Sequence, residues 1–387
     1  MRIAQRAQAI APFFAMELSK QAQALAAQGH DVIKLNIGEP DFGAAPAVVA
    51  AMRAAVTEQK TQYTAALGIA PLRESIAQHY ADTYGVHVSP SRIVVTAGGS
   101  AALLLACAAL VDVGDEVLMA DPCYPCNRQF VGSYGGTTKL VPTDASTRYQ
   151  LNAAHIATHW GERSRGVLLA SPANPTGTAL PLTELAAVCE AVKARGGYRI
   201  VDEIYLGLSY SDTRQSVLSV DDDAVVVQSF SKYFNMTGWR LGWIIAPEWL
   251  VPTLEKLAQH LFICPSTPTQ HAALACFQAD SLALYEERRA AFKARRDYLV
   301  PALRNLGFGV PVMPDGAFYV YADVSKFSTD SAAFAQTLLH RAHVAVTPGL
   351  DFGDAAPRQH VRFSYAAGLE TLHAAVSRLD EVTRTGL

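Results

Sequence analysis

Lys232 and Arg240 lie in the segment SFSKYFNMTGWRLGW, residues 229–243, which follows the apolar run AVVVQ and leads into LGWIIA. A lysine at a strand end, near a second cation and sheltered from water, has a pKa below its usual value of about 10.4. Such an amine is partly neutral and can condense with an aldehyde to form a Schiff base. We therefore expect Lys232 to hold an aldehyde covalently. The plainer alternative is a surface lysine in a loop.

Pyridoxal 5′-phosphate is an aldehyde cofactor that also carries a phosphate, and its ring draws off electrons while its pyridine nitrogen stays protonated. Asp202, at the end of YRIVD, is the candidate carboxylate that keeps this nitrogen protonated, although it could also be a helix N-cap. Tyr205 and Asn174, the latter in the turn NPTG, are candidate donors to the ring's phenolate oxygen. Tyr124, in DPCYPC, is expected to stack on the ring or to be a core tyrosine, and Glu203 is expected to be structural.

The phosphate group requires backbone N–H groups and positive charge. The segment TAGGSAALLLA runs from an expected strand through two glycines into an expected helix, whose first turn presents free amides and the positive end of the helix dipole. We expect amides of this turn, together with hydroxyl and guanidinium groups around the lysine, to bind the phosphate: Gly99, Ser100, Ala101, Ser229, Ser231 and Arg240.

These residues follow short apolar segments that we expect to be strands: RIVVTAGG, DEVLMADP, RGVLLASP, YRIVDEIY and AVVVQSFS. The segments lack polar–apolar alternation and are separated by helical patterns such as residues 182–197. This pattern predicts a largely parallel sheet covered by helices on both faces. Ligands of such sheets bind at the carboxyl ends of the strands, where the candidate residues lie.

The texture of the chain changes after Pro268, where a long helical pattern over residues 286–307 is followed by the strand-like segments GAFYVYADV, VAVTPG and HVRFSYA. The first forty residues hold a helical pattern that stops at Gly29 and a short strand, VIKLNI. We expect an α/β protein with a large domain of residues 45–270. A smaller α+β domain would comprise residues 1–44 and 271–387.

The composition narrows the functional classes. The chain has 387 residues, of which 50% are hydrophobic and 17% charged, as in a well-packed enzyme. Its net charge of −3, without a Lys/Arg-rich run, does not indicate a nucleic-acid partner. We expect a cytoplasmic location, because the N-terminus lacks a secretory signal pattern. The longest apolar stretch, residues 101–111, is too short to span a bilayer.

The six cysteines are expected to be reduced thiols. Cys123 and Cys126 form a CxxC motif, for which zinc or redox chemistry is the alternative reading. Because the sequence holds no second CxxC pair and no nearby histidine, we expect no metal site.

At these motifs the sequence resembles the class I and II aminotransferases, which have fold type I of the pyridoxal-phosphate enzymes. The resemblance implies a mostly parallel seven-stranded sheet flanked by helices, a smaller α+β domain, and pyridoxal 5′-phosphate as cofactor. It also implies a homodimer with shared active sites, because Tyr63 matches a tyrosine that reaches the phosphate in the neighbouring subunit. The resemblance covers almost the whole chain through NIGEPDF, QYTAALGIAPLRESIA, VTAGGSAAL, DPCYPC, SPANPTGT, VDEIY, SFSKYFNMTGWRLGW and VRFSYA.

The resemblance also assigns roles by position. Lys232 would be the Schiff-base lysine and proton shuttle, with Asp202 on the pyridine nitrogen. Arg362, in HVRFSYA, matches the arginine that clamps the substrate's α-carboxylate, with Asn174 and the backbone of Gly38 beside it. A bidentate guanidinium suits a planar carboxylate, whereas the alternative for this strand arginine is a surface ion pair.

The implied reaction is transamination by a ping-pong mechanism through an aldimine of Lys232, in which the freed amine removes the α-proton. Relatives that use aspartate without a dedicated second arginine have a lysine where Ser100 stands, and a serine cannot pair with a distal carboxylate. The sequence therefore favours a neutral or aromatic L-amino acid as donor and 2-oxoglutarate or pyruvate as acceptor. Arg128, in YPCNRQF, is a candidate reader of a side-chain carboxylate, although a solvated helix arginine is the simpler interpretation.

Three alternatives remain on this scaffold: a C–S β-lyase, an aspartate aminotransferase, and a regulatory module that senses the cofactor without turnover. They remain because the cofactor carries the chemistry and details of the site steer it. Pyruvate and ammonia released from cystathionine would indicate the lyase. A visible spectrum unchanged by added amino acids would indicate the regulatory module.

Overall fold

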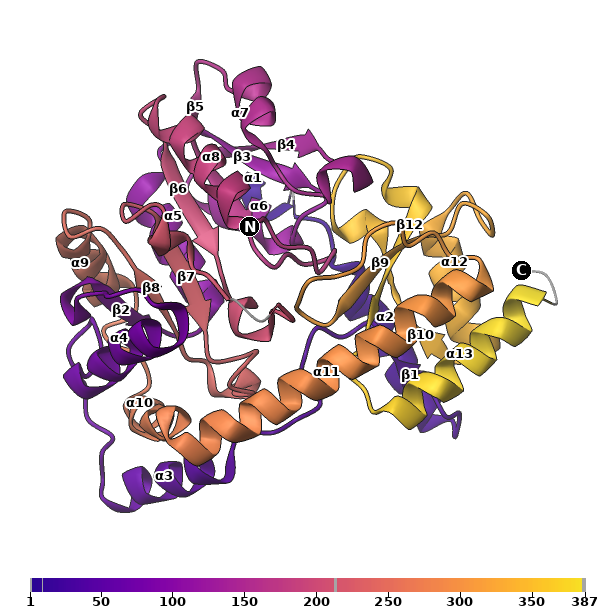
Figure 1. The fold of residues 1–387 in the computed structure, drawn as a ribbon, viewed down its shortest axis with the longest axis horizontal. Helices are drawn as coiled ribbons and strands as arrows, with labels where there is room; N and C mark the ends of the chain where they lie inside the picture. The colour runs from indigo at the N-terminus through magenta and orange to yellow at the C-terminus, as the bar shows by residue number, and fades with distance from the viewer. Residues whose placement is uncertain (1, 9, 212–213, 385–387) are drawn as a thin grey trace.

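The computed structural model describes residues 2–8, 10–211 and 214–384. Its largest element is a seven-stranded sheet with the order β2-β8-β7-β6-β5-β3-β4 (Figure 1). β8 is antiparallel to both of its neighbours, and the remaining pairs are parallel. This confirms the predicted α/β fold with a mostly parallel sheet. The strands are β2 (Ile93–Thr96), β3 (Glu116–Asp121), β4 (Thr137–Pro142), β5 (Ser164–Ala170), β6 (Tyr198–Asp202), β7 (Val225–Ser229) and β8 (Gly242–Ile245).

Alternate residues of these strands pack into two different hydrophobic clusters. Val94 and Ile244 belong to one cluster, whereas their chain neighbours Val95 and Ile245 belong to the other. Successive side chains of a strand point to opposite faces, so the two clusters are the cores on the two sides of the sheet. Both faces being buried explains why the strand sequences are apolar without alternation.

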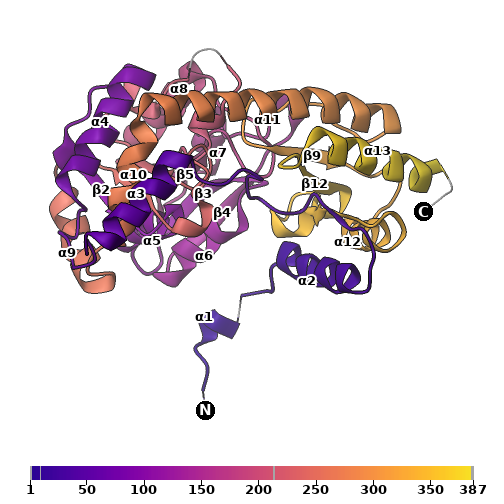
Figure 2. The ribbon, with the colours of Figure 1, turned by 90° about the horizontal axis from the view of Figure 1, so that it is seen from below.

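Helices cover both faces of this sheet (Figures 1 and 2). α5 is buried along most of its length and packs against β7 and β8, and α8 packs against β6. α4 ends at Tyr84 and is capped by Gly85, whose positive φ of 68° gives the left-handed conformation typical of a helix C-terminus. The helices are α3 (Pro46–Thr57), α4 (Ala70–Tyr84), α5 (Gly99–Leu110), α6 (Pro125–Ser133), α7 (Ala153–His159), α8 (Leu182–Lys193), α9 (Val251–Leu261) and α10 (Thr267–Ala273).

A second, antiparallel sheet has the order β11-β12-β9, and a two-stranded parallel pair joins β1 to β10. The segment VAVTPG, expected as one strand, therefore contributes two short strands to different sheets. The long helix α11 packs against α13 in this part of the molecule (Figure 1). The elements are β1 (Ile33–Lys34), β9 (Tyr319–Asp323), β10 (Val344–Ala345), β11 (Thr347–Pro348), β12 (His360–Ser364), α1 (Gln5–Gln8), α2 (Phe14–Ala27), α11 (Ala279–Leu306), α12 (Ser331–Thr337) and α13 (Leu369–Arg384).

The division into residues 45–270 and residues 1–44 with 271–387 stays a prediction. The expected boundary at 270 falls within α10, and the 28-residue helix α11 follows with only the short turn η6 (Leu274–Phe277) between them. Within the described ranges, no helix combines the length and the apolar character that crossing a membrane would require.

Candidate active site

A cavity of about 300 Å³ lies where the carboxyl ends of the central strands meet the N-terminal segment of the chain. Such a position at the strand ends is where ligands bind in open α/β sheets. Most of the residues expected from the sequence line this one cavity: Gly38, Gly99, Ser100, Tyr124, Asn174, Asp202, Tyr205, Ser229, Ser231, Lys232, Arg240 and Arg362.

Lys232 lies three residues beyond the end of β7, and its Nζ donates a hydrogen bond of 2.6 Å to the carbonyl oxygen of Gly38. Burial and, to a smaller extent, the nearby guanidinium groups of Arg362 and Arg240 together lower the pKa of this amine to about 8. The carboxylate of Asp202 opposes this shift. A substantial fraction of Lys232 is therefore neutral near physiological pH, as nucleophilic chemistry requires.

Asp202 is the last residue of β6, and its side chain is only 4% exposed. Its Oδ1 accepts a hydrogen bond of 3.1 Å from the backbone N–H of Ile204, and the next short helix, η3 (Leu206–Leu208), has Tyr205 as its N-cap. Asp202 is therefore not a helix N-cap. Burial raises the pKa of its carboxyl to about 7, although the N–H of Ile204 and the charge of Lys232 act in the opposite direction.

The turn between β2 and α5 forms one end of the cavity. Gly98 has a φ of 90°, and a Cβ at this position would lie 2.6 Å from a guanidinium nitrogen of Arg240. The first hydrogen bond of α5 runs from the N–H of Ala102 to Gly98, so the amides of Gly99, Ser100 and Ala101 precede it. Such amides have no acceptor within their helix and suit an anion.

The hydroxyl and guanidinium groups expected at the phosphate lie beside this turn. The Oγ of Ser229 accepts a hydrogen bond of 3.0 Å from the N–H of Ser231. Arg240 Nη1 donates to the carbonyl oxygen of Thr237 at 2.9 Å and lies 3.5 Å from the Oγ of Ser231. One cation, two hydroxyls and the helix N-terminus are thus brought together at the same end of the cavity.

Arg362 lies on β12 at the opposite side of the cavity and is 3% exposed. Nη1 donates to the Oδ1 of Asn174 at 2.8 Å, and Nη2 donates to the carbonyl oxygen of Asn36 at 2.7 Å. Its guanidinium carbon lies 4.4 Å from the ring centre of Tyr319, and its Nε is buried without a partner. Arg362 is therefore not part of a surface ion pair, and it retains hydrogen-bonding capacity for a ligand.

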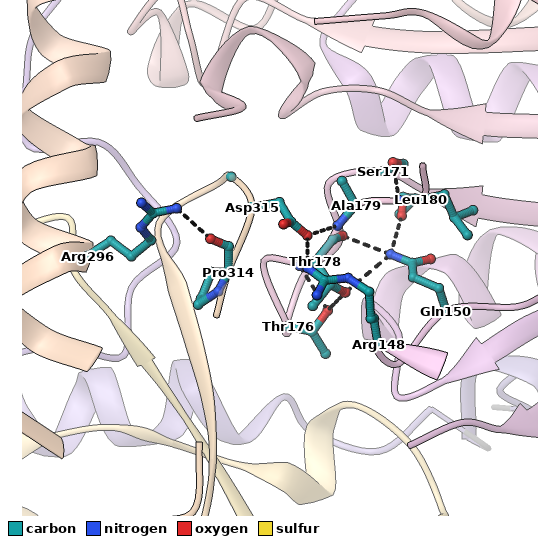
Figure 3. Close-up of polar contacts among 12 residues, drawn as sticks. Arg148, Gln150, Ser171, Thr176, Thr178, Ala179, Leu180, Arg296, Pro314 and Asp315 are labelled. Atoms are coloured by element: carbon teal, nitrogen blue, oxygen red, sulfur yellow. Dashed lines mark hydrogen bonds and ion pairs between the residues drawn. The ribbon is translucent and has the colours of Figure 1, made fainter. Parts of the chain in front are cut away.

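The loop that carries Asn174 is fixed by a polar network (Figure 3). The carboxylate of Asp315 accepts hydrogen bonds from the backbone N–H of Ala179, at 2.8 Å, and from Arg148. On the other side of the loop, Gln150 Nε2 donates to the carbonyl oxygen of Thr178 at 2.8 Å. These contacts come from two separate segments, residues 148–150 and the segment of Asp315, so the loop is held from both sides.

The sequence model of the family described as aminotransferase class I and II matches residues 30–379. The chain belongs to this family.

Individual relatives give the same result. The valine–pyruvate aminotransferase of Mycobacterium tuberculosis is 39% identical over 380 residues, which cover 98% of this chain and 97% of the relative. The aspartate aminotransferase of Thermotoga maritima is 34% identical and covers 95% of each chain. The crystal structure of an aminotransferase from Mycobacterium tuberculosis matches all of both chains with a TM-score of 0.95 and 38% identity. The chain is an aminotransferase, and its cofactor is pyridoxal 5′-phosphate.

The cavity of this aminotransferase fits that cofactor. Asp202 is a buried carboxylate without a salt bridge in the described part of the chain, and a protonated ring nitrogen would supply the missing cation. The turn at Gly98 leaves room for the guanidinium of Arg240 where a Cβ would crowd it. The amine of Lys232 lies in the same cavity, with its Nζ 5.7 Å from the ring centre of Tyr205.

Tyr319 and Asn36 line the cavity but were missed by the sequence analysis. The hydroxyls of Tyr319 and Tyr205 are 2.8 Å apart, and a Cβ at Gly38 would collide with the Tyr319 hydroxyl. The available signals were the position of Asn36 two residues before Gly38 and the tyrosines of GAFYVYADV. Neither signal says which side chains of those segments face the cavity.

Other expected residues lie elsewhere in the aminotransferase. Tyr63 is 80% exposed and does not line the cavity. Ala101 is buried and does not line the cavity either. Arg128 donates to the carbonyl oxygen of Asp351 at 2.8 Å, so it is not the solvated helix arginine expected. The difference is explained by its partner, because the carbonyl oxygen of Asp351, distant in the sequence, holds the Arg128 side chain away from solvent.

Two further motif residues have local roles. The buried carboxylate of Glu203 accepts hydrogen bonds from the Oγ of Ser216, at 2.9 Å, and from the N–H of Val217, at 2.7 Å, which agrees with a structural role. Cys123 and Cys126 are free thiols rather than a disulfide.

Proposed function

We propose that this aminotransferase moves the amino group of a neutral or aromatic L-amino acid to pyruvate or 2-oxoglutarate. The main observation in support of this proposal is the distribution of charge on the cavity wall. Among the described lining residues, the cations are Lys232, Arg240 and Arg362, and each already has a proposed partner other than a substrate side chain. The wall near α2 carries no charged side chain: Phe13, Ala15, Met16 and Ile37 are apolar, and Ser19 and Asn36 are polar but uncharged.

A distal carboxylate would therefore enter this cavity without a cation to pair with it, which is costly in a partly buried site. Ser100 lines the cavity and brings no charge. The 39% identity to a valine–pyruvate aminotransferase supports a neutral donor and pyruvate as acceptor. The 34% identity to an aspartate aminotransferase favours the acidic donor as the second candidate.

In the proposed mechanism, Lys232 would hold the cofactor through its aldehyde group. When its Nζ is free, this amine would accept the substrate's α-proton and give a proton back, a role suited to an amine with a pKa of about 8. The bound cofactor supplies the electron sink. Asp202 keeps the ring nitrogen protonated, and Tyr205 and Asn174 donate to the phenolate oxygen. Because the one proposed α-carboxylate site at Arg362 would serve both substrates in turn, the acceptor would enter only after the first product leaves, in a ping-pong order.

The remaining residues bind and orient. Arg362 and Asn174, with the backbone of Gly38, are proposed to clamp the α-carboxylate, and Tyr124 to stack on the ring. We propose that the phosphate is bound by Gly99, Ser100, Ala101, Ser229, Ser231 and Arg240, and by Tyr63 of a second copy in a homodimer. We also propose a cytoplasmic location, in keeping with amino acids and 2-oxo acids as substrates.

Reduction with borohydride tests the covalent link. We expect peptide mapping of the freshly purified, reduced protein to find a pyridoxyl adduct on Lys232, and an adduct on another lysine would contradict the mechanism. A panel of amino acids, followed by the change in cofactor absorbance, tests the substrate. Faster conversion by leucine, valine or phenylalanine than by aspartate supports the proposal. Preference for aspartate, or pyruvate and ammonia from cystathionine without transamination, overturns it.

A further inference from the structure

Helix α2 forms one wall of the cavity through Ala15, Met16 and Ser19, together with Phe13 just before it. The chain that leads to this helix, including α1, projects from the body of the molecule (Figure 2). Phe13 is the N-cap residue and supplies no side-chain hydrogen bond. The free amides of the first turn must therefore find their acceptors elsewhere.

Asp351 supplies those acceptors from a distant part of the chain. It ends the short helix η8 (Gly349–Asp351) and is 5% exposed. Its Oδ1 accepts a hydrogen bond of 2.9 Å from the N–H of Phe14, and its Oδ2 accepts one of 2.9 Å from the N–H of Ala15. A carboxylate at a helix N-terminus makes charge-assisted bonds and complements the helix dipole.

Asn36 holds the same turn from the other side. Its Nδ2 donates to the carbonyl oxygen of Ala15 at 3.1 Å and to the Oγ of Ser19 at 2.8 Å, and the residue is 1% exposed. Its own carbonyl oxygen accepts the Nη2 of Arg362 at 2.7 Å. One residue thus connects α2 to the arginine proposed to clamp the α-carboxylate.

The segment that carries Asp351 is itself fastened to the end of the large sheet. Arg128 donates to the carbonyl oxygen of Asp351 at 2.8 Å, and the N–H of Cys123 donates to Phe352 at 2.8 Å. The Oδ2 of Asp121, the last residue of β3, accepts from the N–H of Asp354 at 2.9 Å. The position of α2 is therefore fixed, through Asp351, relative to the large sheet that carries the proposed cofactor-binding residues.

We propose that Asp351 and Asn36 are positioning residues that seat α2 on the cavity and thereby set the enzyme's selectivity for the substrate side chain. The seated helix presents Phe13 and Met16 to whatever extends beyond the α-carboxylate. Contact with these side chains favours a large apolar group over a methyl group, because the benefit grows with the apolar area buried. The selectivity part rests on the proposed function, whereas the seating of α2 does not.

Asp351→Asn in the holoenzyme tests both parts. Asparagine offers one oxygen to two N–H groups and turns its own amide N–H toward the second, so the first turn of α2 should loosen. We expect backbone hydrogen exchange in a peptide covering the start of α2 to speed up about 10-fold or more, with peptides from β6 and β7 unchanged. The KM for leucine should rise about 10-fold, that for alanine less than about 3-fold, and kcat should change little.

Asp354→Asn is the matched control, because it removes the same charge from an exposed side chain of the same segment. It should leave both measurements as in the unmodified enzyme. Unchanged exchange in α2, or equal rises in KM for leucine and alanine, overturns the proposal. Faster exchange throughout the molecule would show a general loss of stability and also counts against it.

Ser19→Ala is a milder variant if Asp351→Asn does not fold. It removes one acceptor of Asn36 and leaves the carboxylate anchor in place, so intermediate effects on the same two measurements are expected. If leucine is not a substrate, the exchange result still decides the seating of α2. If leucine is a substrate and α2 loosens without a change in KM, the selectivity role is wrong while the proposed function stands.

Discussion

The protonation state of the Lys232 amine depends on the charged groups around it. Its cavity also contains Arg240 and Arg362, and both cations disfavour an ammonium at Lys232. Asp202 and Glu39 act in the opposite direction, but burial and the two arginines prevail. The side chain is therefore kept nearer to neutrality than an ordinary lysine, and this property can be measured without substrate.

We predict that Lys232 of the cofactor-free protein reacts with an amine-acylating reagent with a midpoint near pH 8, the value to which its pKa is lowered. The neutral amine is the reactive form, so the rate should rise through that pH. The unfolded lysine keeps its proton up to its usual pKa of 10.5, so the stability contributed by this group should rise between about pH 8 and pH 10.5 and then level off. Quantitative peptide mapping over a pH series gives the midpoint.

Arg240→Gln removes one of the two cations and should move that midpoint upward. Arg195→Gln, at an exposed site in the turn that follows α8, should leave it unchanged. A midpoint near pH 10 in the unmodified protein would show that the cavity does not tune this amine.

At the residue scale, sequence reasoning found the side chains that belong to strand-end motifs and missed those that do not. Lys232, Asp202 and Asn174 follow recognisable strands, so their meeting at one sheet edge could be predicted. Asn36 and Tyr319 come from segments of the other part of the chain. Their approach to the cavity depends on how that part packs against the large sheet, which local patterns do not encode.

The turn between β2 and α5 shows how an element sets the geometry of a site. Gly98 has φ 90° and ψ 171°, a conformation that is almost closed to residues with a Cβ. Strand, turn and helix can therefore follow one another closely enough for Arg240 to reach the helix N-terminus.

We predict that Gly98→Ala weakens binding of pyridoxal 5′-phosphate by at least about 10-fold, because the new Cβ would lie 2.6 Å from the Arg240 guanidinium and displace it. The backbone strain should also lower the free energy of unfolding by about 1–3 kcal/mol. Cofactor titration by absorbance and thermal unfolding measure the two effects. Gly85→Ala is the control, because Gly85 also has a positive φ but no atom within 4 Å of an added Cβ. It should lose stability while retaining its cofactor affinity, and equal cofactor loss in both variants would exclude the displacement.

At the element scale, the long apolar strands of the large sheet were predictable because burial on both faces leaves a continuous apolar run. The segment VAVTPG was not, since β10 and β11 have two residues each and belong to different sheets. Strands of this length are defined by their partners rather than by their own sequence.

At the scale of the whole molecule, the exposure of Tyr63 is the feature that the proposed homodimer would explain. An aromatic side chain that is 80% exposed and outside the cavity cannot serve the phosphate of its own chain. A symmetric dimer would place two such side chains in two equivalent sites.

We predict that a hybrid dimer of Tyr63→Phe and Lys232→Ala chains has about half the activity of the unmodified dimer, because one of its two sites combines native Lys232 with native Tyr63. The Lys232→Ala homodimer should be inactive and the Tyr63→Phe homodimer should bind the cofactor more weakly. Co-expression with two affinity tags isolates the hybrid. Activity no higher than half that of the Tyr63→Phe homodimer would place the tyrosine in its own chain's site, and a chain that sediments as a monomer would end the dimer proposal.

Arg240 adopts a left-handed backbone conformation with φ 54° and ψ 62°. Glycine would occupy that conformation with less strain, by up to about 1–2 kcal/mol. A screen that ranked substitutions by the heat resistance of the empty protein would therefore reward glycine at this position. Such a screen would select a more stable protein that lacks the arginine proposed to bind the phosphate. Thermal screening of this enzyme should therefore be done with pyridoxal 5′-phosphate bound.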